Sequence, residues 1–392
     1  MNKTKLIFVM GFMQVGGIEK SLIRLCNALD PNTYDITVLF LCVGDGISTE
    51  LPNNVKKFFI SRNKTRSFSK QYSKMLSKCY AKIINLAYGN YNKIIKRLFY
   101  YLVKVENIFF KRYIKGLLKQ DYYDVSIGFM QGEPSDVATS CICANKYVTF
   151  YRHGSVLEFL NDKKYYHKSD VIVTLSSGLK NELVKKRGLQ EKKIRVIYNI
   201  YDIENIKSKS QEECELDRID KLKLVTVARI SPEKGIIQAI EAASLLKKSG
   251  VDFCWLFVGD DKSKYANTCK EKINEYGLQE NVKIIGVRMN PYPYFRCCNI
   301  YVQPSEIECL SNAIVEALIL QKPIISTNTY GAKELIDNYN NGLLCEFNSE
   351  ALAESIIKLI CDNDLRCSLI QGTKRIIANL ESEMEKYYAL FL

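Results

Sequence analysis

The stretch PSEIECLSNAIVEALILQKPIIST, residues 304–327, carries the pattern that decides the fold. It follows one short apolar run and ends in another, and each run is typical of a buried strand. Between them, Ser311 and Asn312 are good N-cap residues for a helix. Glu316 lies inside the otherwise apolar part of that helix. Because a buried charge without a partner is costly, Glu316 must either face solvent on one stripe of the helix or have a partner.

The same alternation of apolar run and helical pattern extends through the rest of the chain. A polar stretch, Asp202–Lys221, separates two such series. Strands that alternate with helices indicate a parallel, doubly wound sheet, which binds ligands at the carboxyl ends of its strands. We therefore expect an α/β fold with two Rossmann-like domains facing a cleft, residues 1–201 and 202–378. We also expect a C-terminal helix, residues 379–392, that packs back on the N-terminal domain.

The composition is that of a globular protein with 392 residues, 47% of them hydrophobic and 25% charged. The fourteen Cys include no C-x2-C pair and the two His lie far from the close Cys pairs, so we expect no metal. Scattered cysteines of this kind indicate reduced thiols and a cytoplasmic location. No stretch approaches the ~20 apolar residues of a spanning helix. The start, MNKTKLIFVMGFMQVGG, faintly resembles a signal peptide, but its short apolar run predicts a strand, a loop and a helix.

The net charge of +13 is concentrated in one segment, residues 56–119, which has seventeen Lys/Arg and one acid. Within it, Lys70, Lys74, Lys78 and Lys82 recur every four residues, which places them on one face of a basic amphipathic helix. Such helices bind anionic membrane surfaces. A solvated face over a helical core explains the same pattern, and so does nucleic-acid binding, although no recognition motif accompanies the charge. We expect basic aromatic helices that face a membrane, and no nucleic-acid partner.

The segment VARISPEKG, residues 227–235, also follows an apolar run and opens a helix. It would place Arg229 and Lys234 at the end of a strand beside a helix N-terminus, a combination that suits a diphosphate. A solvated helix cap explains the same residues. Glu308 precedes the helix of the opening stretch and can reach a ligand over its end, whereas Glu316 can accept hydrogen bonds from ligand hydroxyls. This arrangement suits a nucleotide sugar.

These segments resemble the retaining family-4-type glycosyltransferases, which have the GT-B fold. The family signature E-x7-E, followed by K-P-[IV]-[IV], corresponds to residues 308–325, and RISPEKG resembles the family's diphosphate motif. Two further blocks, GLQENVKIIG after LFVGD and GAKELIDNYNNGLL, occur in the family's order. One departure affects the sugar site, because Cys309 stands where the family usually has Gly. Leu310-Ser311 likewise replaces the usual Phe-Pro.

The resemblance implies roles for residues of the C-terminal half. Glu308 would be catalytic and orient the sugar hydroxyls, and Glu316 would bind the ribose. The donor diphosphate would bind Arg229, Lys234, Leu310, Ser311 and Asn312. No divalent metal and no cofactor would be required.

The N-terminal half resembles the same family more weakly. Gly16, Gly17 and Glu19 match a G-G-[IAV]-E loop that lines the cleft on the acceptor side. His153 follows a predicted strand, where the family has a catalytic histidine that approaches the donor sugar. Ser176 and Asn199 match scaffold positions near the hinge.

The resemblance implies a retaining glycosyltransferase. The donor would be a UDP-hexose or UDP-N-acetylhexosamine, and the acceptor a lipid-linked saccharide of capsule, exopolysaccharide or O-antigen synthesis. The protein would be peripheral at the inner face of a bacterial cell membrane. Two alternatives are a nucleotide-sugar epimerase of the same fold and a non-catalytic subunit that binds sugar nucleotide or lipid.

Overall fold

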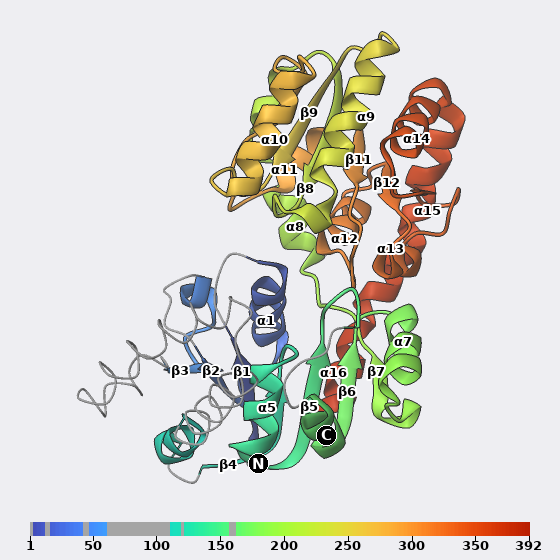
Figure 1. The fold of residues 1–392 in the computed structure, drawn as a ribbon. Coiled ribbons are helices and arrows are strands. Elements are labelled where there is room, and N and C mark those ends of the chain that lie inside the picture. The colour runs from blue at the N-terminus through green and yellow to red at the C-terminus, as the bar shows by residue number, and fades with distance from the viewer. Residues whose placement is uncertain (1–2, 12–15, 42–46, 61–109, 119–120, 157–161) are drawn as a thin grey trace, which may run out of the picture.

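The computed structural model describes residues 3–11, 16–41, 47–60, 110–118, 121–156 and 162–392. It has two α/β lobes, each built on a parallel sheet, and Figure 1 shows them one above the other. The expected class, an α/β fold with two Rossmann-like domains, is confirmed.

The N-terminal lobe has a seven-stranded sheet in the order β3-β2-β1-β4-β5-β6-β7. All neighbours pair in parallel. The central strand β1 is buried on both faces, which explains why residues 6–10 are an unbroken apolar run. The strands are β1 (Thr4–Met10), β2 (Tyr34–Phe40), β3 (Lys56–Phe59), β4 (Tyr122–Gly128), β5 (Cys143–Tyr151), β6 (Val171–Thr174) and β7 (Ile194–Val196). The helices are α1 (Gly17–Ala28), α5 (Glu133–Ser140), α6 (Asp162–Lys168) and α7 (Ser177–Arg187).

The C-terminal lobe has a six-stranded parallel sheet in the order β10-β9-β8-β11-β12-β13. The polar stretch before it contains α8 (Ile203–Lys209) and one short turn of 3₁₀ helix. The strands are β8 (Leu222–Val227), β9 (Phe253–Val258), β10 (Val282–Ile284), β11 (Ile300–Gln303), β12 (Ile324–Thr327) and β13 (Leu343–Cys345). The helices are α9 (Ile236–Lys248), α10 (Lys264–Glu275), α11 (Tyr292–Cys297), α12 (Asn312–Ile319), α13 (Tyr330–Leu335) and α14 (Ser349–Cys361).

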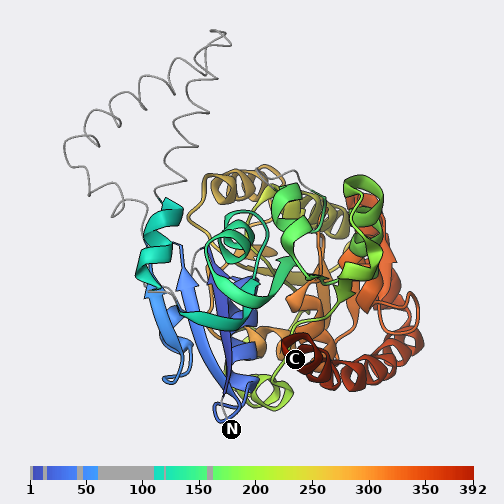
Figure 2. The same ribbon diagram turned by 90° about the horizontal axis from the view of Figure 1, so that it is seen from below.

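The last helix packs on the N-terminal lobe, as expected. Helix α15 (Asn363–Glu381) runs along one side of the molecule and α16 (Glu383–Phe391) lies within the lower lobe (Figures 1 and 2). Tyr387, Leu390 and Phe391 are buried in the N-terminal core, where the ring of Phe391 packs edge-on against Phe8 at 6.1 Å. The expected boundary at residue 379 falls inside α15.

The basic segment falls mostly outside the described residues, including the four lysines predicted to share a helix face. At its described ends, residues 56–59 form strand β3 and residues 110–117 are helical. Phe110, Ile114 and Leu118 are buried against the N-terminal core. Among the described residues, no helix combines the length and apolar character needed to cross a bilayer. Membrane-surface binding stays a prediction.

Candidate active site

Two loops at the carboxyl ends of β8 and β11 pack directly against each other. Gly235 has a φ of 65°, and a Cβ there would lie 1.8 Å from the carbonyl oxygen of Pro304. Next to this contact, the N–H of Glu306 donates to the carbonyl of Glu233 at 3.0 Å. Because only glycine tolerates both the left-handed backbone and this close approach, Gly235 brings the RISPEKG loop against the loop that carries Glu308.

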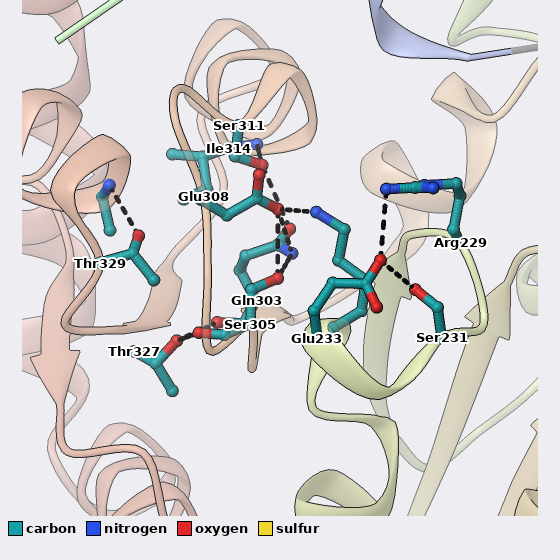
Figure 3. A network of polar contacts seen from close by, with 12 residues as sticks. Arg229, Ser231, Glu233, Gln303, Ser305, Glu308, Ser311, Ile314, Thr327 and Thr329 are labelled. Atoms are coloured by element: carbon teal, nitrogen blue, oxygen red, sulfur yellow. Dashed lines mark hydrogen bonds and ion pairs between the residues drawn. The ribbon is translucent and has the colours of Figure 1, made fainter. Parts of the chain in front are cut away.

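Glu308 is held by three side-chain donors at the junction of these loops (Figure 3). The Nζ of Lys234 lies 2.7 Å from its Oε1 atom, and both side chains are 13% exposed. Ser305 Oγ donates to the same oxygen at 3.1 Å and Gln303 Nε2 at 3.4 Å. The carboxylate therefore has a fixed position in a largely dehydrated site. The sequence placed Lys234 and Glu308 in one site but did not predict that they form an ion pair.

Arg229 has a different environment from Lys234, although both were predicted to bind a diphosphate. Its side chain is 73% exposed and lies 3.3 Å from Glu233. Ser231 Oγ donates to the same Glu233 oxygen at 2.8 Å (Figure 3). The two predicted cations thus differ in burial: Lys234 lies within the site, and Arg229 is exposed to solvent.

The N-terminus of α12 has the features that the sequence predicted. Ser311 is its N-cap, and its Oγ accepts a hydrogen bond from the N–H of Ile314 at 3.3 Å. The N–H groups of Asn312 and Ala313 make no hydrogen bond to the described residues. Such free groups favour an anion. Leu310, one residue before the cap, is buried.

The Asn312 side chain joins the two lobes. Its Oδ1 accepts hydrogen bonds from Asn199 Nδ2 at 2.8 Å and from the hydroxyl of Tyr201 at 2.6 Å. Its Nδ2 donates to the carbonyl of Gly17 at 3.1 Å. The side chain therefore holds α12 against the N-terminal lobe, and its backbone N–H is the group open to a ligand.

Glu316 is buried, so the interpretation that it lies on a solvent stripe is wrong. Its partner comes from the other lobe: Nη2 of Arg24 on α1 lies 2.6 Å from Glu316 Oε1. The same Nη2 donates to the hydroxyl of Tyr292 at 3.1 Å. The charge in the apolar helix is thus compensated across the interface between the lobes.

Gly16, Gly17 and Glu19, which were predicted to form a loop, lie at the start of helix α1: Gly16 is its N-cap, and Gly17 and Glu19 belong to its first turn. A Cβ on Gly17 would lie 2.8 Å from Asn312 Nδ2, and one on Gly16 would lie 2.5 Å from a Glu19 carboxylate oxygen. Burial raises the pKa of Glu19 above its usual value, although the cations of Arg229 and Arg152 oppose the shift. The N-terminus of α1 therefore faces the start of α12.

His153 lies beside the Glu308 loop. Its Nδ1 is 3.2 Å from the N–H of Ser155 and 3.1 Å from the hydroxyl of that residue. A Cβ on the next residue, Gly154, would lie 2.5 Å from the carbonyl carbon of Glu308. The N-terminal lobe thus contacts the backbone of the predicted catalytic carboxylate directly.

Cys309, the departure from the family pattern, is buried in this contact. A Cβ on Gly331 would lie 2.5 Å from the Cys309 carbonyl oxygen, and one on Gly154 would lie 2.8 Å from the Cys309 N–H. Burial raises the pKa of its thiol to about 12. The side chain is therefore a neutral packing group at neutral pH.

Three residues at the interface were not predicted from the sequence. Glu334 of α13 accepts hydrogen bonds from the N–H of Ser177 at 3.0 Å and the hydroxyl of Tyr198 at 2.7 Å. It lies in the GAKELID block, which was quoted without a role for this residue. Arg152 donates to Asn199 at 2.6 Å and packs on the rings of Phe129 and Phe150. Arg24 is the third. The sequence feature that could have identified it is a cation within the apolar run LIRLC.

Cys214, Asp217 and Cys297 form a group whose ligand atoms all lie within 4.8 Å of one another. Arg296 already forms an ion pair with Asp217 at 2.9 Å, and the Cys297 thiol donates to the same carboxylate at 3.0 Å. These contacts satisfy the carboxylate without an ion. The expectation that no metal is required stays a prediction.

Comparison with protein families gives two matches that together cover most of the chain. Residues 15–205 match the model for Glycosyltransferase Family 4, and residues 209–376 match the model for glycosyl transferases group 1. The boundary between the two matches lies within α8, between the two sheets.

Two curated relatives are bacterial glycosyltransferases. The N-acetylgalactosamine-N,N'-diacetylbacillosaminyl-diphospho-undecaprenol 4-alpha-N-acetylgalactosaminyltransferase of Campylobacter jejuni is 30% identical over 203 residues, 51% of this chain and 53% of the relative. The capsular polysaccharide biosynthesis glycosyltransferase CapM of Staphylococcus aureus is 27% identical over 238 residues, 56% of this chain and 62% of the relative. The chain thus spans about half to three-fifths of the length of these relatives.

Two solved structures have the same fold along the whole chain. A glycosyltransferase from Rickettsia africae aligns with a TM-score of 0.73 at 22% identity, covering 100% of this chain and 98% of that chain. Anabaena HepE in complex with UDP-glucose aligns with a TM-score of 0.69 at 17% identity, covering 98% and 99%. Together with the two family matches, these similarities confirm the resemblance noted in the sequence: the chain belongs to the glycosyltransferases with the GT-B fold.

Proposed function

We propose that this protein is a retaining glycosyltransferase whose donor is a UDP-hexose or a UDP-N-acetylhexosamine. The observation that carries the proposal is the position of the Lys234–Glu308 ion pair. It lies next to the N-terminus of α12, where two backbone N–H groups have no partner among the described residues. Cation, helix end and carboxylate are the groups that a nucleotide sugar needs for its diphosphate and its sugar hydroxyls.

Each residue of this site has a proposed role. The diphosphate binds the first N–H groups of α12 together with Lys234, and Arg229 neutralises it from the solvent side. Fixed cations and N–H donors stabilise the charge that develops on a leaving diphosphate, so the proposal needs no metal ion. Glu308 orients the sugar hydroxyls, and Glu316 accepts hydrogen bonds from the ribose.

The acceptor is proposed to approach from the N-terminal lobe, past Gly16, Gly17, Glu19 and His153. Contact of Gly154 with the Glu308 backbone supports this path, because it places His153 next to the donor-side loop. We propose a lipid-linked saccharide of bacterial surface polysaccharide synthesis as the acceptor. The names of the Campylobacter and Staphylococcus relatives, which refer to a diphospho-undecaprenol substrate and to capsule synthesis, support this class.

A protein that acts on a lipid-linked acceptor must reach the membrane. We propose that it binds the inner face of the cell membrane from the cytoplasm through the basic segment, residues 56–119, which has seventeen Lys/Arg and one acid. Salt-sensitive binding to vesicles with anionic lipid would support this location. Equal binding to neutral vesicles, or none to either, would contradict it.

The test of the function is transfer from UDP-sugars to polyprenyl-diphosphate-linked saccharides, with the anomeric configuration of the product read by NMR. Wild-type protein should form a product with the configuration of the donor, and Glu308→Gln should lose ~100-fold or more in rate. Glu306→Gln is the matched control, because Glu306 is exposed two residues away. A Glu308→Gln variant that transfers at the wild-type rate would contradict the proposed role.

The same assay separates the two alternatives. An epimerase would convert the nucleotide sugar when no acceptor is present. A non-catalytic subunit would bind the nucleotide sugar and turn over none of the donors or acceptors. Acceptor-dependent release of UDP excludes both.

A further inference from the structure

Arg24 and Glu316 form an ion pair that is buried between the two lobes. Their side chains are 12% and 8% exposed, and Arg24 Nη2 lies 2.6 Å from Glu316 Oε1. The guanidinium also packs over the ring of Tyr201, with its central carbon 4.9 Å from the ring centroid. Burial opposes the charged form of Arg24, but the Glu316 carboxylate outweighs it, so the pKa of Arg24 lies above its usual value. Arg24 therefore stays charged.

Each partner of this pair keeps one atom without a hydrogen bond. Arg24 Nη1 is buried and has no acceptor among the described residues. Glu316 Oε2 accepts no hydrogen bond from the described residues, because the contact with Arg24 uses Oε1. Buried donors without a partner are rare in native proteins and costly. The pair therefore has a buried donor without a partner on one lobe and a carboxylate oxygen outside the ion pair on the other.

We propose that Arg24 and Glu316 together recognise the ribose diol of the donor nucleotide, so that the ribose site is completed across the interface. This inference rests on the proposed function, which gives Glu316 alone the ribose. A vicinal diol matches the two free atoms, because one hydroxyl donates to Glu316 Oε2 and the other accepts from Arg24 Nη1. A deoxyribose lacks one hydroxyl and leaves one of the two atoms unpaired.

The proposal makes Arg24 a binding residue for the ribose of the donor. Helix α1 then contacts the ribose of a nucleotide whose diphosphate binds at α12. Donor binding therefore favours the arrangement of the two lobes in which Arg24 and Glu316 form their ion pair. Asn312, which bonds the carbonyl of Gly17 at 3.1 Å, ties the same two helices at their N-termini. Its contact involves no group that a ribose would use.

The test is calorimetric binding of UDP and 2′-deoxy-UDP to the full chain. Wild-type protein should bind UDP at least about tenfold more tightly than 2′-deoxy-UDP, because the analogue leaves a charged group unpaired. Arg24→Met should lose about tenfold in UDP affinity, and most of the preference for UDP over the deoxy analogue. Arg195→Met is the matched control, because Arg195 is exposed on β7 and donates to the carbonyl of Lys192, three residues away. It should keep both affinities.

A folding defect is controlled with a second variant. Arg24→Met leaves Glu316 buried without its cation, whereas Arg24→Met/Glu316→Gln restores neutrality and should melt at a temperature closer to that of wild type. The double variant should bind UDP and 2′-deoxy-UDP equally. An unchanged preference in Arg24→Met overturns the inference alone, whereas an unchanged preference in the double variant also contradicts the ribose role proposed for Glu316. Tighter UDP binding by Arg24→Met also overturns it, because Arg24 would then compete with the ribose. If wild-type protein binds no UDP, this result contradicts the proposed function and therefore also the inference.

Discussion

Lys234 and Glu308 lie 74 positions apart in the chain, yet the Nζ of one is 2.7 Å from the Oε1 of the other. The pair joins the two loops that the sequence marked as functional. Because both side chains are largely buried, the interaction is screened less than a surface ion pair. In the proposed mechanism, the carboxylate that meets the sugar and the cation that meets the diphosphate therefore act as one unit.

The difference in burial between Lys234 and Arg229 predicts unequal roles in diphosphate binding. Lys234→Met should weaken UDP binding about tenfold or more, because charge-assisted hydrogen bonds in a dehydrated site are strong. Arg229→Met should cost only about two- to threefold, because its exposed charge is screened by solvent and salt. Isothermal titration calorimetry of both variants checks this. An equal loss, or a larger loss for Arg229→Met, would count against the assignment.

Replacement of Gly235 by alanine is predicted to be much more damaging than the same replacement at Gly188. Both have positive φ values, 65° and 64°, but a Cβ on Gly188 would meet nothing within 4 Å. Gly188→Ala should therefore cost only the backbone strain of about 1–2 kcal/mol. Gly235→Ala adds a clash with Pro304 and should lower the melting temperature further and weaken UDP binding. Thermal denaturation and titration of both variants measure the contrast, and equal behaviour would refute it.

Cys309 is predicted to resist alkylation in the folded protein. Burial raises the pKa of its thiol from 9.0 to about 12, so almost no thiolate forms near pH 8. The exposed Cys143, Cys361 and Cys367 should react first with iodoacetamide, and Cys309 only after unfolding. The raised pKa also means that the unfolded state releases this proton more readily. Stability should therefore fall as the pH rises from about 9 towards 12. Peptide mass spectrometry checks the labelling, and early modification of Cys309 would contradict it.

Because α16 packs in the N-terminal lobe, substitutions at its adjacent residues Phe391 and Leu392 should differ in their effect on stability. Phe391 is buried against Phe8 and Tyr34, whereas Leu392 is 90% exposed. Phe391→Ala should destabilise the N-terminal lobe by about 3–5 kcal/mol, and Leu392→Ala by less than about 0.5 kcal/mol. Chemical denaturation of the two variants gives the comparison. Similar stabilities would mean that α16 does not contribute to the core.

The sequence predicted the architecture because alternating apolar runs and helical patterns are local signals. The loop motifs also located Glu308 and Lys234, since both follow strands whose carboxyl ends meet at one edge of a parallel sheet.

The partners of the site residues could not be predicted in the same way. Arg24 reaches Glu316 over 292 positions, and Asn312 reaches Gly17 over 295. Such contacts depend on how the two lobes pack, which no local pattern encodes. The one available signal was that a cation in one apolar run and a carboxylate in another each lacked a local partner.

The central claim is that the site around Lys234 and Glu308 binds the diphosphate of a uridine nucleotide. It is tested most directly by the melting temperature of the full chain with saturating UDP, GDP, ADP or CMP. Ligands that bind only the folded state raise its stability, by about 2.7 kcal/mol at a hundredfold excess over Kd. We predict a clear rise with UDP that is much reduced in Lys234→Met, and smaller effects with the other nucleotides. No rise with UDP, or an equal rise in Lys234→Met, would contradict this claim.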